Sequence, residues 1–120
     1  MSVRFAFVGF RHPHIFDMYQ RCRDRDDVEI VACCEEDAAT REELATRDDL
    51  EFTHTSCDAM LDEVECDVVA VGDSYGLRVG WILGALERGR HVISDKPICI
   101  SLSELDQIEA AASEKNRIMG

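Results

Sequence analysis

The stretch DVVAVG at residues 67–72 decides the fold class of this chain. Small and branched apolar residues in a continuous run, closed by a glycine, are typical of a strand buried on both faces. Similar runs lie upstream at 3–8 (VRFAFV) and 28–34 (VEIVACC), and a shorter one lies downstream at 91–94 (HVIS). Because these runs do not alternate with polar residues, they predict a parallel sheet that is covered by helices on both faces.

Segments with apolar residues at helical spacing separate these strands. Pro13 suits the first turn of a helix, Ser56 is a candidate N-cap, and Gly89 stops the helix before it. Ser101 followed by Glu104 forms a capping-box pattern. The expected helices are 13–23, 38–46, 56–64, 77–88 and 101–115.

Two weaker strand signals complete the pattern. Residues 50–53 predict a short third strand, and residues 117–120 predict the beginning of a sixth one. Strands and helices then alternate along all 120 residues without a linker or repeat. Right-handed crossovers arrange such a chain as a doubly wound parallel sheet. We therefore expect residues 1–120 to be one α/β domain with the Rossmann fold.

The charge of the chain excludes several classes of partner. It has 25 acidic and 13 basic residues and a net charge of −12. Such an acidic surface repels phosphate backbones and anionic lipids, so we expect no binding to nucleic acid or membranes. No apolar run approaches the roughly 18 residues of a membrane span. Residues 1–4 lead directly into a strand without a basic and apolar leader, so the sequence predicts a cytoplasmic protein.

The cysteines raise the question of disulfides or a metal site. None is spaced as C-x-x-C, and two of them are adjacent within the apolar run 28–34. We expect buried, reduced thiols, since a free cysteine behaves as a small hydrophobe. A metal site formed by His12, His14 and a cysteine is the alternative, although these histidines lack a matching ligand set. The cysteines are Cys22, Cys33, Cys34, Cys57, Cys66 and Cys99.

The turn after the first strand is one of three candidate ligand sites. In a doubly wound sheet the ligand crevice lies beyond the carboxyl ends of the strands, next to this turn. The dinucleotide fingerprint G-x-G-x-x-G keeps only Gly9, because Arg11 and His14 occupy the other glycine positions. Together with Phe10, the amides of the helix N-terminus and the side chains of Arg11 and His12 could still hold a pyrophosphate. The alternative is a solvated loop in a domain that has lost its nucleotide.

Glu35 stands at the end of the second strand, 26 residues after Gly9. A carboxylate in this position can accept hydrogen bonds from the ribose hydroxyls of a dinucleotide. It also repels a 2′-phosphate, which favours NAD over NADP as the cofactor. The alternative is a solvated carboxylate within the acidic run at 35–37.

The segment after the strand at 91–94 contains Asp95, Lys96 and Pro97. Pro97 restricts Lys96 to an extended conformation, which would hold its ammonium group in the crevice. A lysine there can polarise or protonate a substrate oxygen, so Lys96 is the candidate catalytic residue. The alternative is an exposed lysine in a turn. Asp73 and Ser74, after the preceding strand, are candidates for cofactor contacts at the same edge.

The order and spacing of these features resemble the N-terminal domain of the Gfo/Idh/MocA oxidoreductase family. The family has an EKP segment, to which the DKP triplet at 95–97 is similar, with Asp95 in place of glutamate. The other matching features are the Gly9 turn, the strand ending in Glu35, and ALERGRHV at 85–92. The resemblance covers nearly the whole chain.

This resemblance implies oxidation or reduction of a sugar-like or inositol-like alcohol carbon with NAD or NADP. It implies that Lys96 takes part in substrate binding and proton transfer close to the nicotinamide, with Asp95 and Pro97 near the cofactor. Family members continue into a second domain that binds the substrate and usually supplies a catalytic histidine. The chain is therefore expected to be truncated before that substrate domain, and the parent to be a homo-oligomer. Asp73 and Ser74 depart from the family's usual turn.

Two functions from different classes stay open. The first is the dinucleotide-binding domain of an NAD(P)-dependent dehydrogenase, inactive by itself. The second is a non-catalytic Rossmann-like binding or regulatory domain, which the altered first loop and the net charge of −12 favour. A measurement of dinucleotide binding separates the two.

Overall fold

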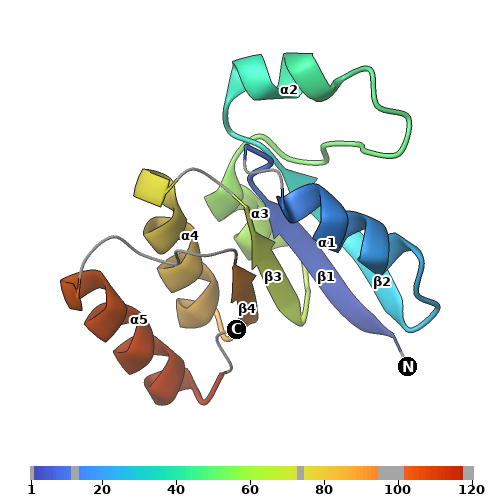
Figure 1. Cartoon of the computed structure of the whole chain (residues 1–120). Helices are drawn as coiled ribbons and strands as arrows, with labels where there is room; N and C mark the ends of the chain where they lie inside the picture. The colour runs from blue at the N-terminus through green and yellow to red at the C-terminus, as the bar shows by residue number, and fades with distance from the viewer. Residues whose placement is uncertain (1, 12–13, 73–74, 95–101, 118–120) are drawn as a thin grey trace.

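The computed structural model describes residues 2–11, 14–72, 75–94 and 102–117. Within them, four parallel strands form one sheet in the order β2-β1-β3-β4 (Figure 1). This order places β1 in the interior, with successive strands added first on one side and then on the other. The doubly wound parallel sheet predicted from the sequence is therefore confirmed. The strands are β1 (Val3–Val8), β2 (Val28–Cys34), β3 (Val68–Val71) and β4 (His91–Ser94).

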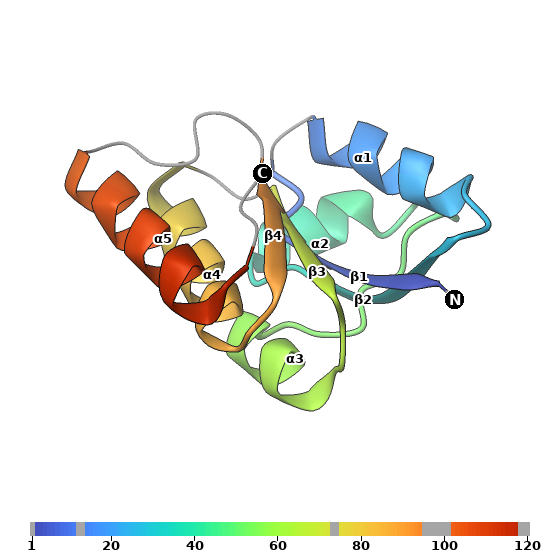
Figure 2. The same ribbon diagram turned by 90° about the horizontal axis from the view of Figure 1, so that it is seen from below.

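Helices lie on both faces of this sheet, as the continuous apolar strands require. Figure 2 shows α1 on one face and α3, α4 and α5 on the other. The short helix α2 lies beyond the carboxyl end of β2 (Figure 1). The helices are α1 (His14–Arg23), α2 (Ala38–Leu44), α3 (Cys57–Glu63), α4 (Tyr75–Glu87) and α5 (Leu102–Lys115).

Side chains that alternate along the strands belong to two separate hydrophobic clusters, one on each face of the sheet. On β1, Ala6 and Val8 belong to the cluster under α3, α4 and α5, while Phe7 belongs to the cluster under α1. The first cluster is the larger and includes the fully buried Met60 and Ile82. Burial on both faces accounts for the unbroken apolar runs of the strands.

Local signals set several helix ends as expected. The Ser56 hydroxyl accepts a hydrogen bond from the Ala59 amide at 3.3 Å, so Ser56 is the N-cap of α3. Gly89 follows α4 with a φ of 78°, a conformation that favours glycine. Pro13 and Ser101, which the sequence predicts at two other helix starts, lie outside the described residues.

The predicted third strand at 50–53 is wrong. The structure describes this segment throughout and has no strand in it; the Thr53 amide donates to the Cys33 carbonyl at 2.9 Å, and the next residue, His54, forms an isolated bridge with Cys34. The Thr53 hydroxyl accepts a hydrogen bond from the Cys33 amide at 3.0 Å, where a neighbouring strand would offer a carbonyl. Leu50 is apolar because it packs in the cluster under α1. A groove of about 530 Å³ therefore runs between the outer side of β2 and residues 48–53.

The prediction of buried, reduced cysteines is confirmed for the described residues. Cys22, Cys33, Cys34, Cys57 and Cys66 are all buried free thiols. Burial raises the pKa of Cys33 to about 12, and burial also raises the pKa of the Cys57 thiol. These two thiols are therefore protonated and unreactive at neutral pH. Cys99 lies outside the described residues, as does most of the predicted strand at 117–120.

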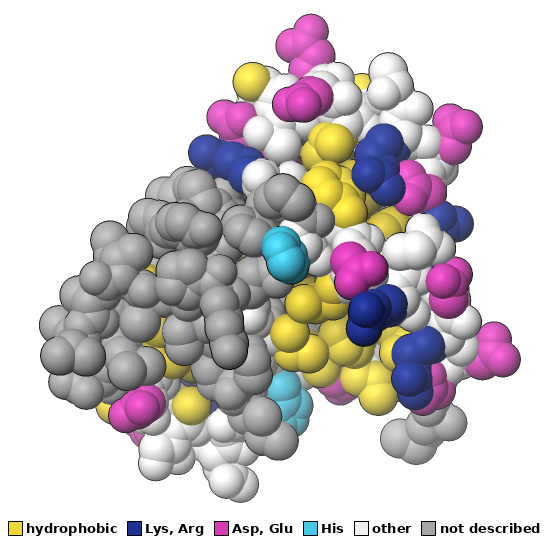
Figure 3. Space-filling model, viewed as in Figure 1, with side chains coloured by type: hydrophobic (Ala, Val, Ile, Leu, Met, Phe, Trp, Pro, Cys, Tyr) yellow, Lys and Arg dark blue, Asp and Glu magenta, His cyan; other side chains and the backbone are white. Residues whose placement is uncertain are grey.

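The face that carries α1 is partly apolar on its outside. Figure 3 shows exposed hydrophobic side chains on this face beside charged ones. Val3, Phe5, Val68 and Ile93 line a shallow hollow of about 450 Å³ there. None of the described helices is long and apolar enough to cross a membrane.

Candidate functional site

The carboxyl ends of all four strands meet along one edge of the sheet. The strand pairing aligns Cys34, Val8, Val71 and Ser94 in a single row across β2, β1, β3 and β4. The segment after each strand therefore begins at the same edge. The adjacency of β1 and β3 places the switch point of the sheet in the middle of this row, where ligands of doubly wound folds bind.

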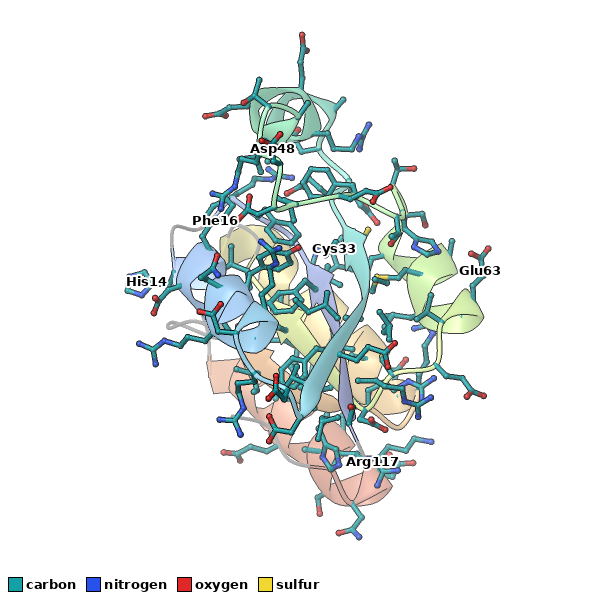
Figure 4. The ribbon with its side chains drawn as sticks, turned by 90° about the vertical axis from the view of Figure 1, so that its right-hand side faces the viewer. His14, Phe16, Cys33, Asp48, Glu63 and Arg117 are labelled. Carbon is teal, nitrogen blue, oxygen red and sulfur yellow. The ribbon has the colours of Figure 1, made fainter. Side chains whose placement is uncertain are left out.

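Gly9 turns the chain out of β1 at this edge. Its φ of 81° lies in the region that favours glycine, and its amide donates to the Cys34 carbonyl at 2.9 Å. The chain then enters α1, a helix of 10 residues that begins at His14. Figure 4 shows the exposed His14 side chain at this helix start, directed away from the domain. A turn that leads directly into a helix N-terminus suits an anionic group.

Phe10 anchors the first loop, the segment 9–13 between β1 and α1, in the core. Its ring is 2% exposed and packs against other aromatic rings, with Phe52 at 5.3 Å and Phe16 at 5.9 Å between centroids. Its backbone amide donates to Glu35 Oε1 at 2.8 Å. The candidate cofactor residue Phe10 thus points its side chain inward, and its amide is already paired.

Glu35 is fully buried at the end of β2. Its Oε1 accepts from the Phe10 amide, and its Oε2 accepts from the Asp37 amide at 3.0 Å. Arg41 donates to the Glu35 carbonyl at 2.7 Å. The position predicted from the sequence is correct, but the carboxylate lies inside the protein, bonded to two backbone amides.

Asp37 and two arginines surround the turn that follows Glu35. The Asp37 carboxylate caps α2 by accepting from the Thr40 hydroxyl at 2.6 Å and the Thr40 amide at 3.0 Å. These hydrogen bonds hold the pKa of the Asp37 carboxyl below its usual value, and attraction to Arg11 and Arg41 adds to the effect. The two arginines therefore lie close to a carboxylate.

Gly72 brings β3 and α1 into close contact. A Cβ atom at this position would lie 2.5 Å from the Ile15 Cβ, a distance that real side chains do not tolerate. In the dinucleotide fingerprint the third glycine permits this kind of close packing, but His14 occupies that position here. Sequence reasoning did not identify the role of Gly72. The available signal was the position of this glycine at the end of the run DVVAVG at 67–72, the clearest strand pattern in the sequence.

An open hollow of about 400 Å³ adjoins the first loop. Its lining comes from two parts of the chain: Phe10, Arg11 and Phe16 from the first loop and α1, and Thr40, Glu43 and Leu44 from α2. The larger groove along β2 includes none of Gly9, Glu35 and Gly72, so it is separate from this edge.

Several predicted site residues lie outside the described part of the chain. His12 belongs to the first loop, Asp73 and Ser74 follow β3, and the triplet Asp95, Lys96 and Pro97 follows β4. Of the predicted residues that are described, the structure brings Gly9, Phe10 and Glu35 into one bonded group, with Arg11 beside Asp37. The described residues contain no cluster of three metal-ligating side chains.

Comparison with known proteins gives a family match over almost the whole chain. A family model described as "Oxidoreductase family, NAD-binding Rossmann fold" (GFO_IDH_MocA) matches residues 3–120. The chain is 29% identical over 96 residues to dTDP-3,4-didehydro-2,6-dideoxy-alpha-D-glucose 3-reductase of Saccharopolyspora spinosa. That match covers 80% of this chain and 29% of the reductase. The curated relatives are much longer, and the chain spans 29% to 32% of their length.

Solved structures share the fold. The WlbA dehydrogenase of Bordetella pertussis, in complex with NADH and UDP-GlcNAcA, superposes with a TM-score of 0.85 at 19% identity. The biliverdin reductase of Synechocystis, in complex with biliverdin and NADP⁺, also gives a TM-score of 0.85, at 20% identity. These matches cover 98% and 99% of this chain but only 36% and 37% of the other chains.

Proposed function

Because the chain belongs to the Gfo/Idh/MocA oxidoreductase family, we propose that it is the nicotinamide dinucleotide-binding domain of a dehydrogenase. The main observation in support is that one edge of the sheet holds the Gly9 turn, the start of α1 and the ends of β2, β3 and β4. The substrate of the parent enzyme is a sugar-like or inositol-like alcohol. The sugar-nucleotide reductase among the relatives supports this substrate class.

The first loop would hold the pyrophosphate of the dinucleotide. Gly9 turns the chain, and the N-terminal amides of α1 offer partial positive charge to an anion. Arg11 and His12 add charge that the missing glycines of the fingerprint would not provide. Asp73 and Ser74 follow β3 at the same edge and would lie near the pyrophosphate or the nicotinamide.

Lys96 is the proposed catalytic residue. It comes two residues after Ser94, the last residue of β4, which is aligned with Val71 and through it with Val8. Asp95 and Pro97 flank the lysine and would set its direction at the cofactor. The bound dinucleotide supplies hydride transfer, and Lys96 would bind the substrate oxygen and move its proton. The parent is proposed to be a cytoplasmic homo-oligomer.

A titration with dinucleotide tests the binding function. NADH at 100 times its Kd should stabilise the 120-residue chain by about 2.7 kcal/mol, measured as a rise in thermal unfolding temperature. ATP and AMP at the same concentration serve as controls for adenine binding alone. No shift with either NADH or NADPH would contradict the proposal.

NADPH should bind more weakly than NADH by about tenfold, the equivalent of 1.4 kcal/mol. The reason is the Asp37 carboxylate in the turn after β2, near which a 2′-phosphate would lie. Isothermal titration at several salt concentrations measures both affinities, and the difference should shrink as salt screens the charges. Equal affinities at low salt would show that Asp37 does not contribute to the choice between NADH and NADPH.

The 120-residue chain by itself should show no dehydrogenase turnover. The chain spans about a third of the length of its curated relatives, and apart from Lys96 the groups proposed to bind the substrate lie in the remaining part of the parent. The test follows NADH formation with a panel of polyols and sugar nucleotides, with the full-length parent as the positive control. Turnover of any of these substrates by the isolated chain would refute the expectation.

A second candidate function is a binding or regulatory domain without catalysis. The specific observation in its favour is that the amide of Phe10 is paired with Glu35, while Arg11 and His14 stand where glycines would admit the pyrophosphate. The dinucleotide titration separates the candidates, because only the first requires affinity for nicotinamide dinucleotides.

A further inference from the structure

Glu35 is the one charged side chain that is fully buried in the described part of the chain. Burying a carboxylate is costly unless hydrogen bonds replace its water. Here both oxygens are paired with backbone amides, Oε1 with Phe10 at 2.8 Å and Oε2 with Asp37 at 3.0 Å. Each side-chain oxygen accepts one hydrogen bond, so Glu35 links the two amides.

The two amides belong to different loops at the ligand edge, the edge of the sheet where the carboxyl ends of the four described strands meet. Phe10 lies in the loop between β1 and α1, and Asp37 lies in the turn between β2 and α2. One carboxylate therefore ties together the two loops that would contact the pyrophosphate and the adenosine ribose. We call the Phe10–Glu35–Asp37 link the carboxylate bridge.

Both ends of the carboxylate bridge are fixed independently. The Phe10 ring packs in the aromatic cluster under α1 at 2% exposure. Asp37 caps α2, and Arg41 from that helix donates to the Glu35 carbonyl at 2.7 Å. The bridge thus joins the loop between β1 and α1, anchored by the Phe10 ring, to the turn that Asp37 caps at the start of α2.

This arrangement differs from direct recognition of the ribose. A carboxylate that binds the ribose hydroxyls must present an oxygen to the ligand crevice, whereas Glu35 is 0% exposed. Turning the side chain toward the crevice would break the bond to the Phe10 amide and leave that buried amide unpaired. Burial and bonding therefore both oppose a contact between Glu35 and the ribose.

We propose that Glu35 is a positioning residue, which holds the first loop in its dinucleotide-binding shape and does not read the ribose hydroxyls. This inference rests on the proposed dinucleotide-binding function. In this loop Arg11 and His14 stand at two glycine positions of the usual fingerprint, and the bond from the Phe10 amide to Glu35 fixes the backbone directly after Gly9. The bridge favours NADH and NADPH alike, because it acts on the loop and not on the 2′ position.

The test compares Glu35→Gln with Glu36→Gln. A glutamine at 35 keeps the shape of the side chain but has one acceptor oxygen, so one amide of the bridge faces an NH₂ group. Glu36→Gln removes the same charge one residue away, and a single glutamine oxygen suffices for the bond that Glu36 accepts from the Cys57 amide. Glu35→Gln should weaken the binding of both NADH and NADPH by about tenfold. Glu36→Gln should leave NADH affinity within about twofold.

Amide hydrogen exchange provides a readout without ligand. In the unmodified chain the amides of Phe10 and Asp37 should be protected, and Glu35→Gln should speed the exchange of at least one of them. Glu36→Gln should leave both unchanged. If Glu35→Gln does not fold, fast exchange of both amides in the unmodified chain overturns the inference, and protection of both supports it.

Each outcome has a distinct meaning. If Glu35→Gln weakens NADH binding but leaves NADPH binding unchanged or stronger, Glu35 contacts the ribose and the inference is overturned. If neither dinucleotide binds the unmodified chain, the proposed function fails. The exchange rates of Phe10 and Asp37 then still decide whether the carboxylate bridge holds the loop.

Discussion

Replacing Gly72 by alanine should destabilise the domain by about 3 kcal/mol, at the upper end of the usual cost of overpacking. The added Cβ would lie 2.5 Å from the Ile15 Cβ and 2.6 Å from its Cγ1. Because the Ile15 Cβ is fixed to the backbone of α1, no change of rotamer relieves this contact, and the whole helix must move. A fall in Tm of about 10 °C is expected for a chain of this size.

The matched control is Gly80→Ala in α4. A Cβ at Gly80 meets no atom within 4 Å. Alanine favours a helix interior over glycine by roughly 0.5–1 kcal/mol, so this variant should be slightly more stable than the unmodified chain. Urea unfolding of the two variants measures the contrast. A change of less than about 0.5 kcal/mol for Gly72→Ala would show that α1 adapts without cost.

Replacing Lys96 by alanine in the full-length parent should lower kcat by at least about 100-fold, within the range that general acid–base groups contribute. Dinucleotide affinity should survive, because the first loop and the carboxylate bridge stay intact. Lys96 follows β4 at the same edge as the Gly9 turn, which is the reason to expect it beside the cofactor. Its removal should change the free energy of unfolding by no more than about 0.5 kcal/mol.

Lys115→Ala provides the control for loss of a lysine. Lys115 is exposed in the last turn of α5, away from the ligand edge. Its removal should leave kcat, KM and dinucleotide affinity unchanged. Steady-state kinetics of both variants, with NADH titrations, separate the two effects. Normal turnover in Lys96→Ala would remove the lysine from the mechanism.

The sheet could be predicted because its strands are buried on both faces. Val8 and Val71, for example, lie in unbroken apolar runs, and a short run of this kind between two helices is typical of a central parallel strand. The same reasoning failed at 50–53. Leu50 and Phe52 are apolar because they pack with Tyr19 and Phe10 under α1, and a short apolar segment does not reveal which neighbour buries it.

The candidate site could be predicted by position but not by bonding. The sequence placed Glu35 directly after the second strand, and the structure has it there, at the edge where the parallel strands end. Its partner amide at Phe10 is 25 positions away in the sequence, and spacing contains no information on such a bond. The aromatic residue directly after Gly9, in a loop without further glycines, was the available signal that another group fixes the loop.

The irregular path of residues 50–53 has a consequence for the behaviour of the domain in concentrated solution. Because these residues form no strand, β2 is an edge strand of the described sheet. It lies beside the groove of about 530 Å³. A strand border with unpaired backbone groups can add a strand from another molecule and so begin aggregation. Charged side chains gather around this border: Arg23, Glu29, Asp48, Asp49 and Glu51. Four of these five are acidic, so electrostatic repulsion between copies opposes pairing at this edge, which no further strand covers among the described residues. Part of the net charge of −12 therefore contributes to colloidal stability.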